Sequence, residues 1–484
     1  MITGILFFVV TSIVALFLFA VTVFVHELGH FIAGKKMGLV IERFAIGFGP
    51  KIAGWKKDGV EYVINWLPLG GYVALPQMAP MEMVEGKNEK TQEDLPEITP
   101  WAKIVVAFFG PLFSFLLALT LAFLVSWIGY PVSGNVNTTT IGYIAEDSAA
   151  SNSELEIGDT ILEIDGHEAM GWRGHPHAVQ ESIVLGTNKN VNLKVRKLNG
   201  EIKEYSIEPE EMENHENLRA LGILGAEDVY IDSLIKDSPG ELAGLKKGDH
   251  VIKVNGQKIY NRIQVIDIVE EGGNSAVDLL VRRNEKEMSF NIQPRVGYFL
   301  IENEDGSEIE EPTEKALIGI NGWGAENSVL KPSPWTQIAN SSTLIFRTLS
   351  AIASKDSSVG VQHLSGPVGI YRIIQAQLAV DWRRVLHFFV ILNVNLAILN
   401  LMPIPILDGG HIVFSVVEWL RRKPLEVKLM YAMQSGFYFL LMGFFIFITY
   451  KDVVRWHRDS KTEQEVKKIE QKVKTLIFKP ENNS

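Results

Sequence analysis

The sequence predicts an α-helical membrane protein that carries a large water-exposed insert of mixed α and β structure. Two observations support this fold class: long uncharged apolar runs and an uneven distribution of charge. Of the 484 residues, 47% are hydrophobic and 21% are charged, and the net charge is −11. Residues 131–330 contain 18 basic and 36 acidic residues, a charge of −18, which leaves +7 for the remainder. An acidic insert therefore interrupts a basic, apolar frame.

Composition also excludes several classes of protein. The chain has no cysteine, which removes disulfide frameworks, cysteine-ligated zinc sites and thiol catalysis. Neither part carries a dense basic stripe, so we expect no nucleic-acid partner.

Four segments are predicted to cross the membrane. Residues 5–25 contain no charge, and 21 residues of helix are long enough to cross about 30 Å of hydrocarbon. A signal peptide is disfavoured, because no basic residue precedes this run and ionisable residues follow it at once. Residues 104–130 and 429–450 are also uncharged. Residues 385–407 include three asparagines and end in two prolines, which predicts a span that is broken near its end.

Basic residues in the short loops orient these spans. They follow the first span (Lys35, Lys36, Arg43, Lys51, Lys56, Lys57) and the third (Arg421, Arg422, Lys423, Lys428). Both loops are therefore expected in the cytoplasm, with the N-terminus and the insert outside, in the periplasm of a Gram-negative cell. The tail, residues 451–484, then also lies outside, although it holds 9 basic and 6 acidic residues.

The insert contains an internal repeat with a displacement of 90 residues. Asp147-Ser148, Leu155, Gly158-Asp159 and Gly166 recur as Asp237-Ser238, Leu245, Gly248-Asp249 and Gly256. This period suits two small domains in tandem. The pattern resembles bacterial PDZ domains, most clearly in DSPGELAGLKKGDHVIKVNG, which implies a fold that accepts an extended peptide as an added strand. We expect PDZ-like domains at 131–221 and 222–300.

The segment 301–384 is expected to be a linker followed by an amphipathic region. Residues 302–326 are acidic and contain glycine and proline. Within 334–378, apolar residues recur at helical spacing. This part is compatible with a position on the membrane surface or against the second PDZ-like domain.

The sequence His26-Glu27-Leu28-Gly29-His30 ends the first span. On a helix, residues i and i+4 share one face, so both imidazoles can reach one metal while Glu27 is left to hold a water molecule. The alternative is a helix end whose histidines merely meet the lipid headgroups. That alternative is disfavoured because ionisable groups beside a hydrophobic span are costly unless they are paired or ligated.

Asp408 is the candidate for a third metal ligand. A catalytic zinc takes three protein ligands and keeps one open position. Spans one and three run in the same direction, so Asp408, after the third, reaches the same side as His26 and His30. Taken alone, Asp408-Gly409-Gly410 is also compatible with an ordinary turn.

Together these motifs resemble the site-2 protease family of intramembrane metalloproteases. The motifs are H-E-L-G-H, N-L-M-P-I-P-I-L-D-G-G-H from Asn400, and G-F-G-P from Gly47. The resemblance implies a membrane core formed by 1–130 and 385–450, with four transmembrane helices and a membrane re-entrant β-hairpin at 44–75. It implies Zn²⁺ held by His26, His30 and Asp408, with Glu27 as the general base. It implies substrate contacts from Asn395, Asn400, Gly47, Phe48 and Gly49.

The resemblance also implies a function. We expect a zinc metalloendopeptidase of the bacterial inner membrane, acting as a monomer in the lipid bilayer in regulated intramembrane proteolysis. Its substrates are expected to be single-span proteins: an anti-sigma factor after a first cleavage, in an envelope stress response, and remnant signal peptides. The alternative is a non-catalytic, membrane-anchored PDZ scaffold. A transporter is disfavoured, because there is no inverted repeat.

Overall fold

The computed structural model describes residues 2–78, 95–134, 136–212, 217–302, 307–324 and 327–479. The chain divides into two compact units, which we call the helical unit and the insert unit. The helical unit comprises Met1–Pro131, Leu330–Phe346 and Leu364–Val453, and the insert unit comprises Val132–Val329, Arg347–His363 and Val454–Ser484.

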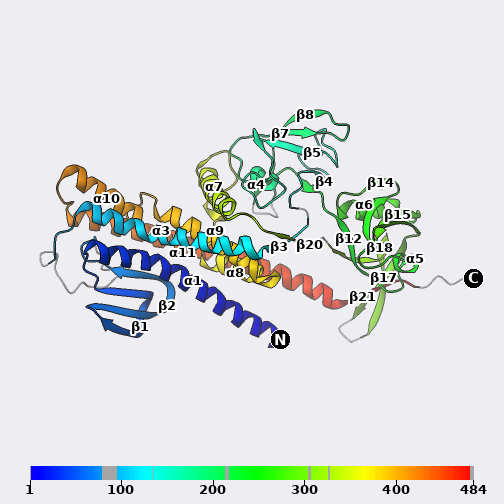
Figure 1. Ribbon diagram of the computed structural model, residues 1–484. Helices are drawn as coiled ribbons and strands as arrows, with labels where there is room; N and C mark the ends of the chain where they lie inside the picture. The colour runs from blue at the N-terminus through cyan, green and yellow to red at the C-terminus, as the bar shows by residue number, and fades with distance from the viewer. Residues whose placement is uncertain are drawn as a thin grey trace, which may run out of the picture. The chain divides into compact units, whose positions relative to one another are not determined.

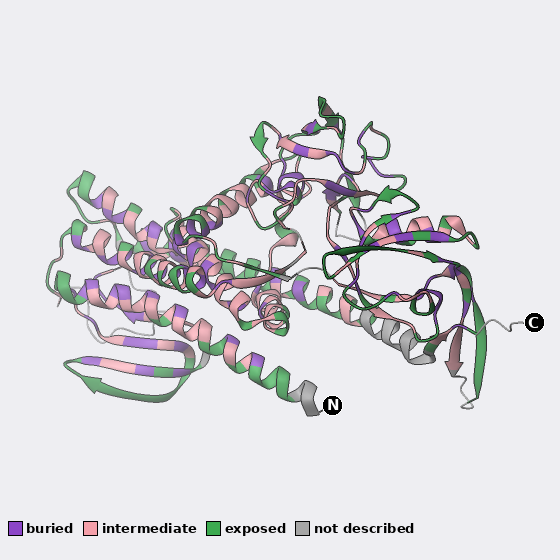
Figure 2. Cartoon of the chain, turned by 45° about the vertical axis from the view of Figure 1, so that its right-hand side comes forward, coloured by how far each residue is buried: buried purple, intermediate pink, exposed green. Residues whose placement is uncertain are grey.

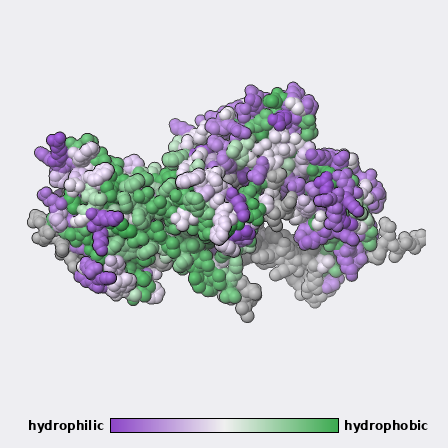
Figure 3. Space-filling view, viewed as in Figure 1, coloured by the Kyte–Doolittle hydropathy of each residue, from purple (hydrophilic) through white to green (hydrophobic). Residues whose placement is uncertain are grey.

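Long helices dominate the helical unit (Figure 1). They are α1 (Ile2–Met37), α3 (Pro100–Ile128), α8 (Pro367–Val380), α9 (Trp382–Asn400) and α10 (Asp408–Arg421), with the first part of α7 (Pro334–Ala353) and of α11 (Val427–Lys472), whose last parts belong to the insert unit. Within the described residues, four segments are long and apolar enough to cross a membrane: Leu6–Met37, Pro100–Ile128, Trp382–Asn400 and Lys428–Thr462. Hydrophobic residues cover the visible surface of these helices (Figure 3), as expected for segments that face lipid. The four predicted spans are thus present as candidate membrane helices.

Small residues let these helices approach closely. A Cβ on Gly29 of α1 would lie only 2.2 Å from the carbonyl oxygen of Phe109 in α3. Ala118 and Ala122 of α3 are fully buried in a cluster with Val390 and Val394 of α9. Close approach through small side chains is typical of helix packing in membranes, where dispersion contacts supply much of the attraction.

The third span ends earlier than predicted. The helix α9 ends at Asn400 rather than continuing to residue 407, and α10 begins at Asp408. Pro403 and Pro405 lie in the intervening turns. Each proline lacks the backbone N–H that would continue a helix, which accounts for the break.

The amphipathic segment packs against the membrane helices of its own unit. Ile338 of α7 belongs to the cluster formed by α3 and α9, and the side chain of Gln337 donates to the carbonyl of Ala122 at 3.0 Å. Ile374 of α8 is fully buried beside α1 and α9, and the hydroxyl of Tyr371 lies 2.7 Å from that of Ser12. These contacts are with helices of the helical unit and not with the second PDZ-like domain, and a position at the membrane surface stays a prediction.

A β-hairpin follows α1. It consists of β1 (Arg43–Lys57) and β2 (Val60–Ala74), which pair antiparallel. Asp58 and Gly59 turn the chain with positive φ angles of 52° and 83°. Gly47 and Gly49 also have positive φ, and register shifts occur between Phe48 and Lys51. The proximal half of β1 is largely buried, and residues from Gly49 to the tip are exposed (Figure 2).

The insert unit contains two β-cores with the same strand arrangement. In the first, four strands have the order β6-β5-β7-β8, and in the second the equivalent order is β14-β13-β15-β16. The first core comprises β4 (Ile141–Ile144), β5 (Thr160–Ile164), β6 (His167–Glu168), α4 (Val179–Val184), β7 (Val191–Arg196), β8 (Ile202–Ile207) and β11 (Ile223–Gly225), beside a small hairpin of β9 (Glu210–Met212) and β10 (Leu218–Ala220). The second comprises β12 (Val229–Leu234), α5 (Pro239–Ala243), β13 (His250–Val254), β14 (Gln257–Lys258), α6 (Arg262–Gly272), β15 (Val277–Arg283), β16 (Lys286–Ile292) and β19 (Ile320–Gly324).

The repeated Gly-Asp pair has the same structural role in both cores. Asp159 and Asp249 have no exposed surface, and each forms an ion pair with a basic side chain. Asp159 pairs with Lys197 at 2.8 Å, and Asp249 pairs with Arg283 at 2.6 Å. Each carboxylate also accepts from a backbone N–H three residues earlier at 2.8 Å. These contacts hold the turn that leads into β5 and β13. The pKa of Lys197 is raised, because its pairing with Asp159 and Glu156 outweighs the opposing effect of desolvation.

The stretch expected to be a linker is instead folded into strands. They are β17 (Arg295–Glu302), β18 (Glu308–Leu317), β19 and β20 (Asn327–Leu330), which pairs with β3 (Tyr130–Ser133). Because β19 pairs with β12, the second core extends beyond residue 300. The acidic residues that suggested a linker lie on the exposed part of β18. The tail also contributes a strand, β21 (Val473–Ile477), which pairs with β17.

Candidate metal centre

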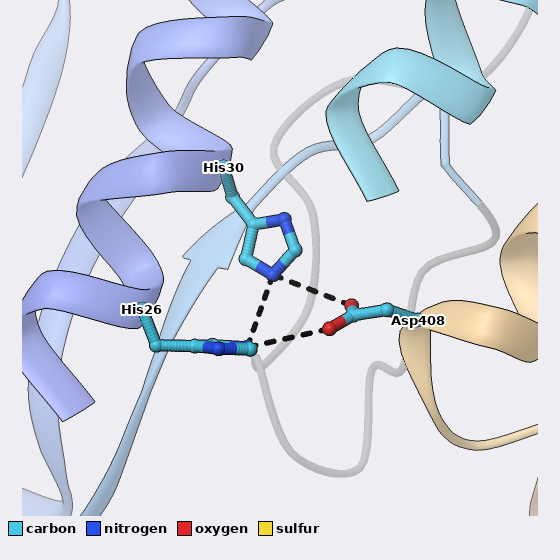
Figure 4. Close-up of side chains that lie close together, drawn as sticks. All are labelled: His26, His30 and Asp408. Carbon is cyan, nitrogen blue, oxygen red and sulfur yellow. Dashed lines mark hydrogen bonds and ion pairs between the residues drawn. The ribbon is translucent and has the colours of Figure 1, made fainter. Parts of the chain in front are cut away.

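The three predicted ligands lie together in the helical unit. His26 and His30 project from one face of α1, and Asp408 is the first residue of α10 (Figure 4). The two Nε2 atoms lie 3.3 Å apart. The Asp408 carboxylate lies 3.3 Å from each of them, through Oδ2 to His26 and Oδ1 to His30. Within the described residues, this is the cluster of histidine and acidic side chains with spacing suited to a metal ion.

These distances fit a tetrahedral zinc site. Ligand bonds of about 2.0–2.1 Å at tetrahedral angles separate neighbouring donor atoms by about 3.3 Å. Two imidazoles and one carboxylate supply three ligands and leave a fourth position, as in catalytic zinc sites. The donor set and its spacing therefore suit zinc.

Contacts behind the imidazoles fix their orientation. His30 Nδ1 donates to the carbonyl of Val106 at 2.9 Å, which leaves Nε2 with the lone pair that a metal needs. His26 Nδ1 lies 3.0 Å from the hydroxyl of Ser114. Both partners belong to α3. Such outer contacts are typical of metal-ligating histidines, because they set the tautomer and the ring angle.

Three glycines on two segments make the close approach of these side chains sterically feasible. A Cβ on Gly110 of α3 would lie 2.2 Å from His30 Nε2. On Gly409 it would lie 2.3 Å from the carbonyl oxygen of Met402, and on Gly410 2.2 Å from that of Ile404. The Gly-Gly pair thus lets the chain fold tightly from the proline turns into α10, and this places Asp408 beside α1.

Glu27 lies between α1 and the β-hairpin. Its side chain lies against β2, near Val73. Its Cγ lies close to Gly71, where an added Cβ would be 3.2 Å away. The glutamate is therefore one residue from a metal-binding histidine and in direct contact with a strand.

The other predicted site residues lie on two elements. Gly47, Phe48 and Gly49 form the irregular middle of β1, where Asn65 donates to the carbonyl of Gly47 at 2.9 Å. Asn395 and Asn400 lie on α9. Neither asparagine forms a hydrogen bond with the three clustered side chains in the described structure, and Asn395 Oδ1 is buried without a partner.

Sequence reasoning missed two residues of the centre, Ser114 and Gly110. Each is a single small residue in an apolar span, so no periodic pattern distinguished it. It also missed Asn393, which is fully buried and donates to Thr22 of α1 at 3.4 Å and to the carbonyl of Phe389 at 2.8 Å. The sequence signal for Asn393 was limited to its being a polar side chain within a predicted span.

A comparison with known families identifies the chain. The profile of Peptidase family M50 matches residues 14–444. The chain belongs to Peptidase family M50. Membership of a peptidase family supports the predicted proteolytic activity over the alternative of a non-catalytic scaffold.

Relatives in this family resemble the chain over nearly its whole length. A protein of Vibrio cholerae named "Putative zinc metalloprotease" is 27% identical and covers 92% of this chain and 98% of its own. The Escherichia coli "Regulator of sigma-E protease RseP" is 26% identical and covers 88% of this chain and 95% of its own. Among solved structures, a PDZ domain of an SdrC-like protein from Listeria monocytogenes is 19% identical, covers 19% of this chain and 85% of that domain, and has a TM-score of 0.15.

Proposed function

We propose that this M50 peptidase is an intramembrane zinc metalloprotease that cleaves transmembrane segments of single-span proteins. One observation carries the proposal. Two histidines of a candidate membrane helix place their Nε2 atoms 3.3 Å apart, and a different oxygen of the Asp408 carboxylate lies 3.3 Å from each of them. Ionisable groups within a membrane helix are costly and are usually functional.

The roles of the residues follow from their chemistry. His26, His30 and Asp408 would hold the zinc, which when bound supplies Lewis-acid catalysis at the open position. Glu27 takes a proton from the attacking water and delivers it to the amine that leaves.

The β-hairpin would bind the substrate. A transmembrane helix hides its carbonyls in internal hydrogen bonds, so the substrate must be unwound before attack. Pairing with β1, through the irregular segment Gly47, Phe48 and Gly49, would replace part of the lost bonding. Glu27 lies close to Gly71 in β2 of the same hairpin, so the proposed general base and the proposed substrate site meet at one hairpin. We further propose that the hairpin re-enters the membrane, and that Asn395 and Asn400 hydrogen-bond the unwound substrate.

The two cores of the insert would be a tandem pair of PDZ domains that screens substrates. Their common strand order and paired Asp159 and Asp249 support a duplication. We place the insert in the periplasm of a bacterial inner-membrane protein, with the metal centre toward the cytoplasm. Pairing of β21 with β17 supports a tail on the same side as the insert, in agreement with four spans.

The substrate class follows the relatives. RseP is named a regulator of sigma-E, so an anti-sigma factor already cut once on its outer side is the proposed substrate in an envelope stress response, and remnant signal peptides are a second class. We propose that one copy of the chain is sufficient for the reaction, because all three ligands and Glu27 come from it.

Zinc content and cleavage measured together test this function. Purified full-length protein should hold one zinc per chain and cleave a single-span substrate in vesicles. Glu27→Gln should keep its zinc and lose cleavage by about 10²–10⁴-fold, the usual contribution of general acid–base catalysis. Glu97→Gln, at an exposed position before α3, is the matched control. Cleavage by Glu27→Gln at the normal rate would refute the role of Glu27, and zinc-free active protein would refute the metal centre.

A further inference from the structure

A separate sheet of the insert unit, formed by β18 and β17, pairs with a segment of the chain's own tail. The residues of β21 pair antiparallel with β17 in the register Tyr298 with Ile477, Phe299 with Leu476, and Leu300 with Thr475. The edge of the sheet formed by β18 and β17 is thus covered by a segment from far along the chain. Addition of an extended segment to a sheet edge is a common mode of peptide recognition.

A socket for an aromatic side chain lies beside this edge. Phe478 is only 4% exposed, whereas its neighbour Lys479 is exposed. A Cβ on Gly319 would lie 3.4 Å from the Phe478 ring, and one on Gly297 would lie 2.7 Å from Leu476 Cδ1. Glycine at position 297 therefore makes room for Leu476, and Gly319 lies within van der Waals reach of the Phe478 ring. A single buried aromatic anchor with exposed neighbours is typical of a peptide-binding site.

Charged side chains close over the same segment. The guanidinium of Arg295 lies over the Phe478 ring, 5.9 Å from its centroid. It donates to the carbonyl of Lys479 at 2.8 Å and to that of Asp237 at 3.2 Å, so it joins the tail to the loop before α5. On the other side, Lys479 Nζ lies 2.5 Å from Glu310 and 4.9 Å from the centre of the Tyr298 ring.

We propose that the β17 edge and the socket formed by Gly297, Gly319 and Arg295 are a peptide-binding site, occupied by residues 475–479 of the same chain. The occupied site fastens the end of α11, the helix with the fourth candidate span, to the sheet formed by β17 and β18. The site lies on a different sheet from β19, and its assignment does not depend on proteolytic activity.

Chain connectivity favours occupation by the same molecule. The helix α11 is unbroken to Lys472, and β21 begins at the next residue. A tail delivered by a stiff helix with no intervening linker is present at a high effective concentration, which favours an intramolecular contact over binding to a second copy.

Engineered cysteines test the contact in the full-length protein, whose lack of cysteine excludes background disulfides. The double variant Leu300→Cys/Thr475→Cys places two thiols directly opposite each other on neighbouring strands. It should form a disulfide within one chain. The control pair Phe299→Cys/Thr475→Cys is offset by one residue, which directs the thiols to opposite faces, and should form little. Failure of the first pair to cross-link, or cross-linking mainly between chains, would overturn the proposal.

A peptide competition tests the site itself. A peptide of residues 473–484 should bind the protein truncated after Lys472 but not the full chain, whose site is filled. A peptide with Phe478→Ala should bind at least about tenfold more weakly, as expected for loss of a buried anchor. A peptide with Thr475→Ala, at an exposed position, is the matched control. Equal binding by the first two peptides, or binding of the wild-type peptide to the full chain, would contradict the assigned socket.

Discussion

Gly110 and His30 are in direct contact, and the contact depends on the missing side chain of the glycine. A Cβ on Gly110 would lie 2.2 Å from Nε2 of His30, the atom that faces His26 and Asp408. The packing of α3 against α1 therefore controls the position of a metal-binding atom. Helix packing and metal binding are set by the same pair of residues.

Substitution Gly110→Ala should remove zinc from the centre. The added methyl group must displace the His30 ring, because the backbone carbonyl of Val106 restrains its other edge. Zinc per chain, measured by mass spectrometry, should fall well below one, and cleavage should fall with it. Gly436→Ala, where a Cβ has no neighbour within 4 Å, should retain both. Full zinc content in Gly110→Ala would show that the helices can separate at no cost to the site.

Substitution Ser114→Ala should weaken zinc binding without unfolding the protein. The hydroxyl lies 3.0 Å from His26 Nδ1, and loss of such outer contacts typically costs about 10–100-fold in metal affinity. Competition with a chelator measures the affinity. Thr120→Ala, which removes a hydroxyl that bonds only the carbonyl of Leu116 on the same helix, should leave the affinity unchanged. Equal affinities would argue that Ser114 does not orient His26.

Chelation of zinc should destabilise the protein reversibly. Removal of the cation leaves two imidazole nitrogens and a carboxylate in close contact, and the binding free energy is lost from the folded state. Zinc restored at about a hundred times its dissociation constant should return about 2.7 kcal/mol, seen as a rise in the midpoint of thermal unfolding. In Asp408→Asn the midpoint should respond much less to the chelator. An equal response in both proteins would place the stabilising zinc elsewhere.

The ion pair between Lys103 and Glu418 should be needed to hold α10 on α3. The two charges lie 2.9 Å apart, and the Glu418 side chain is 7% exposed. Lys103→Met should cost about 3–5 kcal/mol, because it leaves a buried carboxylate unpaired. The double variant Lys103→Met/Glu418→Leu should recover much of this loss. Thermal unfolding of all three proteins gives the comparison, and equal stability of the single and double variants would contradict the expected coupling.

Each core of the insert should respond to loss of its own buried ion pair. Arg283→Met leaves the buried carboxylate of Asp249 without its cationic partner and should destabilise the second core by about 3–5 kcal/mol. Lys197→Met should do the same to the first core through Asp159. Hydrogen exchange followed by mass spectrometry resolves the two cores. Loss of protection in both cores from either substitution would indicate that they unfold as one unit.

Local spacing was sufficient to predict the metal cluster. The i, i+4 spacing of His26 and His30 and the parallel direction of the first and third spans indicated Asp408 as their neighbour, and the three side chains do lie together. Ser114 and Gly110 could not be predicted in the same way. Their importance arises from the approach of α3 to α1, which no pattern within either helix encodes.

Long-range strand pairing also escaped the sequence analysis. The acidic residues on the outer face of β18 have the composition of a linker, although Thr313 and Ala316 of the same strand are buried. For the tail, only the charge was considered and no strand was predicted. The strand there forms because Thr475 pairs with Leu300, which lies far away in the sequence. Pairing between segments so far apart depends on tertiary packing rather than on local preference.

The ligands of the metal centre come from opposite ends of the chain, since His26 and His30 belong to the first helix and Asp408 follows α9. During synthesis, the two histidines enter the membrane long before the ribosome reaches Asp408. With the proposed ligand set, a three-ligand centre cannot form during that interval. Peptidase activity would then begin only after most of the chain has been made.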